Sequence, residues 1–144
     1  MDEYADSSFL VSCYLADAHT PRARVHLSKL ATGLPFTALH ALEVHNALKL
    51  GVFRRLVTEA QSAAAWSDLE SDLRAGRLVR TAMNWQVALR LASTLCKRHS
   101  TNLGTRSLDI LHVACARSLG SSTLSTFDLR QAALARKIGM IAGP

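Results

Sequence analysis

Four acidic residues occur at positions where α/β proteins commonly bind ligands. In an open parallel sheet, ligands bind just beyond the carboxyl ends of the strands. Asp6 and Asp128 each follow a predicted strand, Glu43 lies on the helix after another strand, and Asp109 lies in the first turn of its helix. Carboxylates gathered at one sheet edge repel each other unless a cation lies among them. Mg²⁺ accepts oxygen ligands and also binds phosphate oxygens, so the pattern favours phosphodiester hydrolysis.

Glu43 is the acid that is hardest to explain as an ordinary surface residue. On a helical wheel, Leu39, Ala47 and Leu50 lie within about 40° of it, so the apolar face of the helix carries a carboxylate. A buried acid costs several kcal/mol unless it is paired or coordinated. A salt bridge to an arginine is the structural alternative to a metal ligand.

The other three acids also have structural alternatives. Asp109 could be an acid that the partial positive charge of a helix N-terminus stabilises. Asp128 could be only a helix N-cap, and Asp6 a cap or turn residue. Each position alone is weak evidence, and the combination of four favours a metal site.

The elements that position these acids alternate short extended runs with longer helical ones, which predicts the α/β class. We predict helices over residues 22–31, 39–50, 84–98, 108–119 and 129–137, one or two helices within 53–73, and a helix capped by Ser7 or Ser8. Gly33 and Gly51 are read as helix stops. Short loops between such units imply a parallel sheet. Its predicted strands cover residues 3–5, 34–37, 77–80, 123–126 and 140–141.

Length and composition predict one folded domain over residues 1–144. Hydrophobic residues make up 49% of the chain and charged residues 19%, a balance that excludes intrinsic disorder. The three cysteines form no CxxC pair, which argues against a disulfide framework or a cysteine zinc site, and we expect buried free thiols.

Charge and hydropathy indicate the compartment and the partners. No apolar run is long enough for a membrane span, and the acidic start Met1-Asp2-Glu3 lacks the basic region of a signal peptide, so we expect a cytoplasmic protein without a membrane partner. A net charge of +6 favours a polyanionic partner, either nucleic acid or an acidic protein.

Four segments of the sequence resemble one known family. They are Tyr4 to Val11, Leu42-Glu43-Val44 with Ala47-Leu48, Arg106 to Ala116, and Leu124 to Asp128. Across nearly the whole chain, these segments resemble the PIN-domain family, and specifically the small VapC-type ribonuclease toxins of prokaryotic toxin–antitoxin pairs. The third segment is the most specific of the four.

The resemblance implies a fold, a site and partners. The fold would be a PIN-like α/β/α sandwich with a short parallel central sheet surrounded by helices. The cofactor would be Mg²⁺ or Mn²⁺, and the substrate single-stranded or structured RNA such as tRNA or rRNA. The family also implies a homodimer and a cognate antitoxin that reaches into the active-site groove. The catalytic and metal-binding set would be Asp6, Glu43, Asp109 and Asp128, with Ser7 and Thr126 as supporting polar neighbours.

Basic and aromatic residues supply candidates for RNA contact. Arg106 lies three residues before Asp109 on the same helical face, so it could pair with the acids or meet a phosphate. The other basic candidates, for most of which a solvated charged face is the alternative, are Arg22, Arg24, Lys49, Arg54, Arg55 and Arg130. Trp66 and Trp85 are expected to be exposed, where they could stack on bases or fill an interface.

The histidines do not support a zinc enzyme. His40 and His45 are five residues apart and point to different helix faces, unlike the i, i+4 pair of a zinc protease. His112 is expected to be packed or hydrogen-bonded in the core.

Two rival functions stay open at the level of sequence. One is a non-catalytic basic module of the same fold that binds nucleic acid or protein. The other is an Mg²⁺-dependent phosphatase, which is disfavoured because no lysine lies near a predicted strand end. Dinucleotide and P-loop folds are excluded, since the chain has neither GxGxxG nor GxxxxGK[ST].

Overall fold

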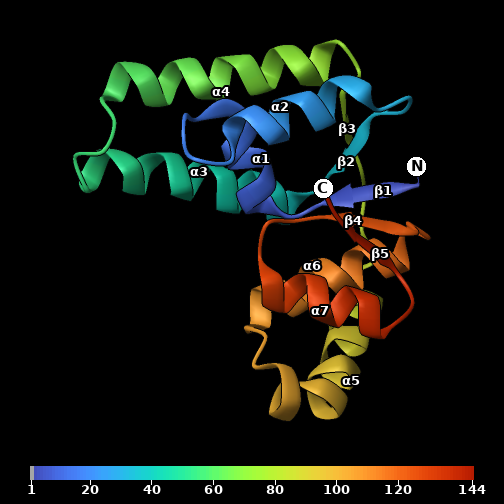
Figure 1. Cartoon of the computed structure of the whole chain (residues 1–144). Coiled ribbons are helices and arrows are strands. Elements are labelled where there is room, and N and C mark those ends of the chain that lie inside the picture. Colours follow the sequence, from blue (N-terminus) through green and yellow to red (C-terminus); the bar gives the residue numbers. More distant parts are fainter. Residues whose placement is uncertain (1) are drawn as a thin grey trace. The chain divides into compact units, whose positions relative to one another are not determined.

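Short parallel strands form the framework of the computed structural model, which describes residues 2–144. One ladder has the order β1 (Glu3–Ala5), β4 (Thr123–Ser125), β5 (Ile141–Gly143). The other pairs β2 (Leu34–Phe36) with β3 (Leu78–Arg80). All three pairings are parallel, which confirms the predicted parallel direction of the strands, and the helices between the strands confirm the α/β class (Figure 1).

The chain forms two compact units, each with its own ladder. The first combines the N-terminal residues up to Asp6 with Ala82–Pro144, and the second is Ser7–Thr81. Each unit is therefore described by itself.

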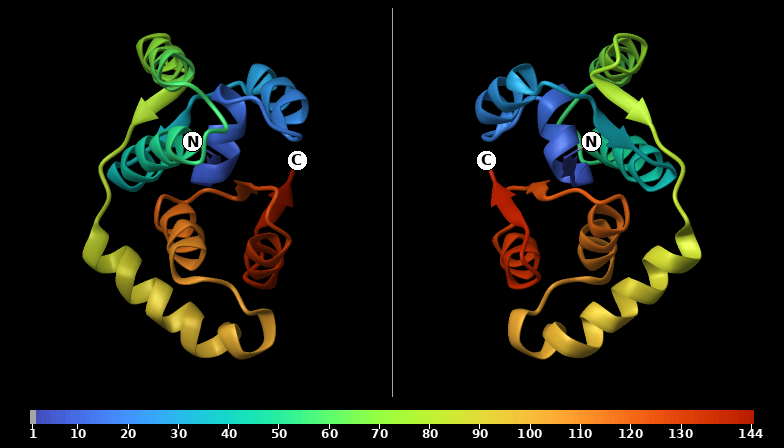
Figure 2. Two further views of the ribbon diagram at one scale, coloured as in Figure 1. Left: turned by 90° about the vertical axis from the view of Figure 1, so that its left-hand side faces the viewer. Right: turned by 90° about the vertical axis from the view of Figure 1, so that its right-hand side faces the viewer.

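In the first unit, helices pack on the β1-β4-β5 ladder. They are α5 (Trp85–Leu103), α6 (Ser107–Ser118) and α7 (Leu129–Lys137). Helix α6 contacts α5, α7, β1 and β4, and α6 and α7 lie side by side in Figure 2. Its residues 110–116 are all buried, so α6 is the central helix of this core. The Tyr4 hydroxyl and His112 Nδ1 form a buried 2.8 Å hydrogen bond between β1 and α6, which confirms that His112 is a core residue.

In the second unit, four helices form the core. They are α1 (Ser7–Tyr14), α2 (Thr20–Lys29), α3 (Ala38–Phe53) and α4 (Glu59–Arg74). Helix α1 contacts the other three, and α3 and α4 run alongside each other (Figure 1). Phe9 and Leu10 of α1 are fully buried in this core. Leu48 of α3 and Leu69 of α4 are buried with them, and at most 2% of either side chain is exposed.

Capping residues start the two long helices of this unit. Thr37 and Thr58 form capping boxes at the first residues of α3 and α4, with His40 and Gln61 as their partners. The segment predicted as one or two helices over residues 53–73 thus contains one, which begins after Thr58.

Several helix ends differ from the prediction. Helix α2 begins at Thr20 rather than at 22, because proline is tolerated in the first helical turn and Pro21 lies there. Helix α5 continues past residue 98 to Leu103 and ends at Gly104, whose φ of 64° is typical of a left-handed cap. Helix α1 begins at Ser7, so neither Ser7 nor Ser8 precedes it as a cap. Within residues 2–144, no helix is long and apolar enough to cross a membrane.

Candidate active site

Asp6 and Thr126 are joined at the carboxyl ends of β1 and β4. The backbone N–H of Asp6 donates to the Ser125 carbonyl at 3.1 Å, which extends the ladder by one bond. The Thr126 hydroxyl then donates to Asp6 Oδ2 at 2.6 Å. Both residues are at least 95% buried. Adjacent parallel strands therefore bring a carboxylate and a hydroxyl together at their ends, as the sequence predicts.

Thr126 also orients Asp128, the third polar residue of this edge. The Asp128 backbone N–H donates to Thr126 Oγ1 at 3.0 Å. Asp128 caps α7, since its Oδ1 accepts from the Gln131 N–H at 2.8 Å. Its Oδ2 accepts no hydrogen bond from residues 2–144. The structural role as a cap is thus real and leaves one carboxylate oxygen available.

Asp109 lies in the first turn of α6, and its side chain is 22% exposed. Its Oδ2 accepts from Arg106 Nε at 3.2 Å, which confirms the predicted pairing on one helical face. Its Oδ1 has no donor among the described residues. Arg106 itself is largely exposed, so this ion pair is weak and the guanidinium can move away from it.

Gln131 links the two helices that carry Asp109 and Asp128. Its side-chain Nε2 donates to the Asp109 carbonyl at 3.0 Å, while its backbone N–H donates to Asp128. The residue is completely buried. Gln131 holds the first turns of α6 and α7 in register, and nothing in the sequence singles it out because its contact depends on how the helices pack.

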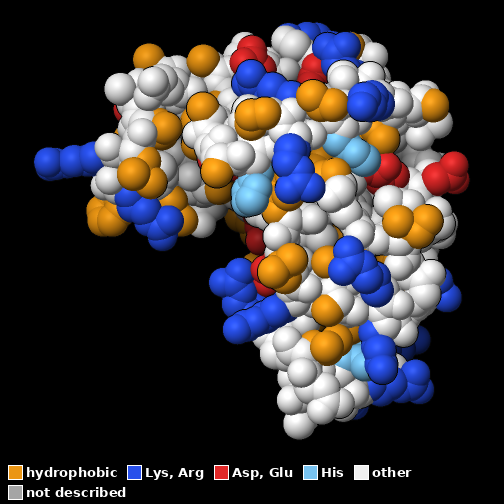
Figure 3. All heavy atoms as spheres, in the orientation of Figure 1, with side chains coloured by type: hydrophobic (Ala, Val, Ile, Leu, Met, Phe, Trp, Pro, Cys, Tyr) orange, Lys and Arg blue, Asp and Glu red, His pale blue; other side chains and the backbone are white. Residues whose placement is uncertain are grey.

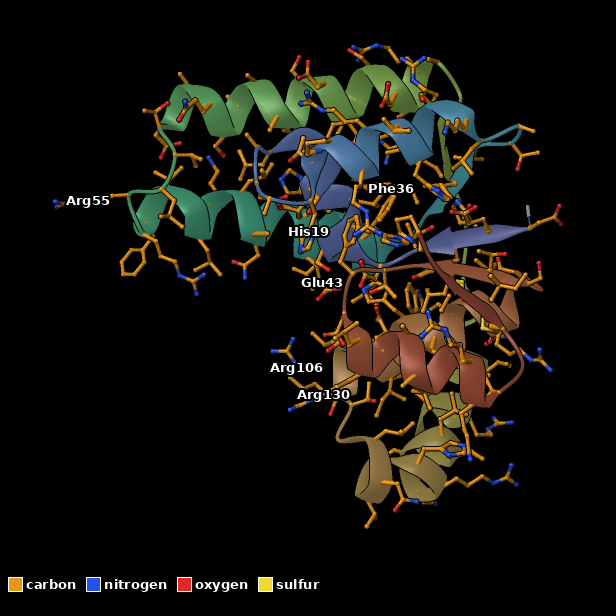
Figure 4. All side chains as sticks on the ribbon, in the orientation of Figure 1. His19, Phe36, Glu43, Arg55, Arg106 and Arg130 are labelled. Carbon is orange, nitrogen blue, oxygen red and sulfur yellow. The ribbon has the colours of Figure 1, made fainter. Side chains whose placement is uncertain are left out.

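Asp109 and Asp128 open onto one pocket of about 400 Å³, which Arg106, Leu129 and Arg130 complete. Figure 4 shows Arg106 and Arg130 extending from the same side of this unit, and in Figure 3 blue side chains lie beside red ones at that edge. Two carboxylates with a free oxygen and two guanidinium groups therefore line the same open pocket. This composition suits a cation together with a phosphate, because the acids can bind a cation and the arginines an anion.

Glu43 and Ser7 form a pair within the second unit. The Ser7 hydroxyl donates to Glu43 Oε1 at 2.9 Å. Glu43 is half-buried on α3, whose start is fixed by the Thr37 and His40 capping box. Ser7, the first residue of α1 in the second unit, directly follows the buried Asp6 of the first unit in the chain.

The donor chemistry fits a hard divalent cation. As they stand, no three His, Cys, Asp or Glu side chains among residues 2–144 are close enough together to hold a metal ion. The pocket that Asp109 and Asp128 line offers carboxylate oxygens and neither histidine nor cysteine, a set suited to Mg²⁺ or Mn²⁺ rather than Zn²⁺.

The cysteines and tryptophans differ from expectation. Cys13 and Cys115 are buried as expected, whereas Cys96 is exposed. Burial raises the pKa of the Cys13 thiol to about 12 and that of Cys115 to about 11, so both stay neutral and unreactive. The prediction that both tryptophans are exposed is wrong. Trp66 and Trp85 are half-buried, and Trp66 stacks on His45 with ring centroids 3.5 Å apart.

Comparison with known proteins places the chain in a family. No curated protein matches the sequence. The crystal structure of FitAcB from Neisseria gonorrhoeae is similar with a TM-score of 0.64 and 15% sequence identity, covering 99% of this chain and 96% of that chain. This similarity shows the fold. The family model for the PIN domain matches residues 4–137, which include every acid of the candidate site. The chain therefore belongs to the PIN domain family.

Proposed function

We propose that this protein is an Mg²⁺- or Mn²⁺-dependent endoribonuclease that cleaves single-stranded or structured RNA, and that the whole chain works as one nuclease domain. The observation that carries the proposal is the pocket in which Asp109 and Asp128 each present a free carboxylate oxygen between Arg106 and Arg130. The family match supports it, because PIN domains are generally nucleases and the match runs through both compact units.

In this proposal the acids divide the work. Asp6, Glu43 and Asp109 hold the ion directly or through water, and Asp128 positions a water or a second ion. When bound, the ion lowers the pKa of the attacking water and offsets charge that develops on the phosphate. The inclusion of Glu43 rests on the sequence pattern and on Ser7, its hydrogen-bond donor, which adjoins Asp6 in the chain.

Thr126, Arg106 and Arg130 support the reaction without binding the ion. The Thr126 hydroxyl fixes the Asp6 carboxylate and the Asp128 backbone at once. Arg106 and Arg130 line the pocket and bind the phosphates of the RNA on either side of the cut. Arg106, whose ion pair with Asp109 is largely exposed, would be able to leave that pair and bind a phosphate.

The biological role follows from the family resemblance. We propose that the protein is the toxin of a toxin–antitoxin pair, that it acts in the cytoplasm, and that it forms a homodimer. A cognate antitoxin would silence it by covering the active-site groove. The net charge of +6 supports an RNA substrate, because each phosphate contact releases counterions.

The test is cleavage of labelled total RNA by the purified protein with Mg²⁺ or Mn²⁺. We expect discrete products that disappear with EDTA and in the Asp6→Asn variant. Asp68→Asn, which removes an exposed acid on α4, is the matched control and should cleave normally. Circular dichroism and melting curves of each variant separate a lost site from a lost fold.

Two results would contradict parts of this proposal, the first the assignment of Asp6 and the second the nuclease activity. Full activity of Asp6→Asn would remove this residue from the site. RNA binding without cleavage, in folded protein free of antitoxin and supplied with both metals, would favour the non-catalytic basic module. In that case the acids would act as the caps and hydrogen-bond partners described above.

A further inference from the structure

The connection between α3 and α4 exposes apolar side chains beside arginines. Residues 53–56 form this segment, here called the α3–α4 tip, and their sequence is Phe-Arg-Arg-Leu. Phe53 is 83% exposed and Leu56 is 76% exposed. Both arginines are exposed, and in Figure 4 Arg55 extends away from the unit into solvent. Large apolar side chains this exposed mark contact surfaces when they occur together.

The backbone of the tip is a helix C-cap that normally uses glycine. The Leu56 N–H donates to the Gly51 carbonyl and the Arg55 N–H to the Val52 carbonyl, both at 2.9 Å, which is the Schellman pattern. Arg55 occupies the left-handed position of this motif with φ of 58°, and it is the single non-glycine residue with positive φ among residues 2–144. Glycine adopts this conformation without strain, whereas arginine is strained there.

The apolar residue of the same motif is also unusual. In a Schellman motif the residue after the left-handed position commonly packs back on the helix. Here that residue is Leu56, which is mostly exposed. The tip thus carries a strained arginine and an unpacked leucine, two choices that oppose folding stability. Such costs are typical of positions kept for binding.

The charge around the tip favours an anionic partner. No acidic residue occurs between Glu43 and Glu59 in the sequence, and Glu59 is engaged by Lys49 at 3.2 Å. Neither Arg54 nor Arg55 has an ion-pair partner among the described residues. Two unpaired guanidinium groups therefore belong to the residues that follow an exposed aromatic ring in the chain.

We propose that the α3–α4 tip is a second RNA contact, in which Phe53 stacks on an unpaired base while Arg54 and Arg55 bind the adjoining phosphates. An aromatic face beside guanidinium groups is the combination with which proteins bind single-stranded nucleic acid. An acidic protein surface would use the two arginines but has no particular need of the flat ring. The inference rests on the proposed function, since it assumes an RNA substrate. It adds that the protein recognises an unpaired base of that RNA.

The experiment measures RNA affinity apart from cleavage. All variants are made in full-length protein that carries Asp109→Asn, which keeps the RNA intact. The probe is a fluorescein-labelled, unstructured RNA oligonucleotide followed by anisotropy, and inorganic polyphosphate serves as a polyanion without bases. Phe53→Ala should weaken RNA binding about five-fold or more and leave polyphosphate binding unchanged, because stacking needs a base. Arg54→Gln with Arg55→Gln should weaken both and lower the salt-dependence slope by about 1.4.

Arg55→Gly separates binding from folding. Glycine removes the strain at the left-handed position, so this variant should melt at a higher temperature and yet bind RNA more weakly. A purely structural role of Arg55 predicts no loss of binding. Arg74→Gln removes the same charge at the opposite end of α4 and is the matched control, which should retain both affinity and slope within about a factor of two.

Several outcomes would overturn the inference. If the Phe53 and Arg54/Arg55 variants bind RNA as tightly as their parent, the tip is not an RNA contact, although the nuclease proposal stands on its separate cleavage assay. If the same variants keep RNA affinity but change the oligomeric state in size-exclusion chromatography, the tip is a protein interface. If the parent binds no RNA, the tip is not a contact for unpaired RNA, and the separate cleavage assay alone decides the nuclease proposal.

Discussion

The Thr126 hydroxyl serves two neighbours at once. It donates its proton to Asp6 Oδ2 at 2.6 Å and accepts the Asp128 N–H at 3.0 Å. The orientation of Asp6 and the start of α7 are therefore coupled through one buried oxygen. Valine has nearly the same shape as threonine and cannot make either bond.

We therefore expect Thr126→Val to lower Mn²⁺ affinity by about ten- to a hundred-fold, the usual effect of losing a group that orients a metal ligand. Isothermal titration calorimetry measures this affinity. Thr126→Ser keeps the hydroxyl and should bind Mn²⁺ nearly as the natural protein does. Equal affinity of the valine and serine variants would show that Thr126 does not orient the site.

Asp17 gives the molecule a pH-dependent contribution away from the candidate site. Partial burial raises its pKa, but hydrogen bonds from the Ser12 hydroxyl, the His19 N–H and the Thr20 hydroxyl outweigh burial and hold the pKa below its ordinary value of 3.8. A carboxyl with a lowered folded-state pKa stabilises the fold above its unfolded pKa, and this contribution is lost as the pH falls through the folded value.

Asp17→Asn should therefore make the stability of the fold less dependent on pH in the acidic range. The difference in melting temperature between natural and variant proteins should be constant above about pH 5 and should shrink below 3.8. Melting curves between about pH 6 and 3 test this. A difference that stays constant down to the lowest pH would mean that Asp17 is not held by these bonds.

Among the elements, α3 depends on an unusual capping box. His40 takes the place of the usual glutamate or glutamine, and its Nδ1 accepts from the Thr37 N–H at 2.9 Å. The ring is fully buried and stacks on Phe36 with centroids 5.7 Å apart. His40 thus fixes the start of the helix that carries Glu43 and also fills the core.

His40→Ala should destabilise the protein by about 3 kcal/mol, because it removes both the cap and a buried side chain. His40→Gln restores an acceptor for the Thr37 N–H and should lower the free energy of unfolding by clearly less. Urea unfolding followed by circular dichroism gives both values. Equal losses in the two variants would show that packing on Phe36, rather than the cap, is what His40 contributes.

Helix boundaries show which sequence signals are reliable. Helix α7 was predicted with its observed bounds, because Asp128 is a strong cap that acts within its own turn. The predicted end of α3 at Gly51 is wrong. Gly51 is buried, and a Cβ there would lie 3.0 Å from a Val57 methyl, so the glycine permits close packing. The helix continues to Phe53, and Arg55 supplies the left-handed turn.

The candidate site likewise contains residues that local sequence predicts and residues that it does not. The strand-end positions of Asp6, Thr126 and Asp128 follow from local sequence, since parallel strands end at one edge. The roles of Glu43 and Gln131 depend on packing between elements distant in sequence. Glu43 could be singled out because a carboxylate on an apolar face is unusual, whereas glutamine at the start of an amphipathic helix is common and gave no signal.

For the molecule as a whole, a bound cation would add to the stability of the fold. Any ligand that binds the native state alone stabilises it by RT ln(1 + [L]/Kd). At a hundred-fold excess over Kd this amounts to about 2.7 kcal/mol, or roughly 8 °C in melting temperature for a chain of this size. Mn²⁺ should raise the melting temperature of the natural protein by this amount, and EDTA should reverse the rise.

The rise in melting temperature should depend on the acidic residues proposed to hold the ion. The variant that combines Asp6→Asn with Asp109→Asn should melt at a temperature that Mn²⁺ does not change, because it lacks two of the proposed ligands. Na⁺ at equal ionic strength controls for screening of the net positive charge, which acts on both proteins alike. An equal rise in both proteins would place the ion elsewhere on the surface. No rise in either would mean that the carboxylates do not hold a metal in the free protein, and the proposed nuclease activity would then require bound RNA to complete the site.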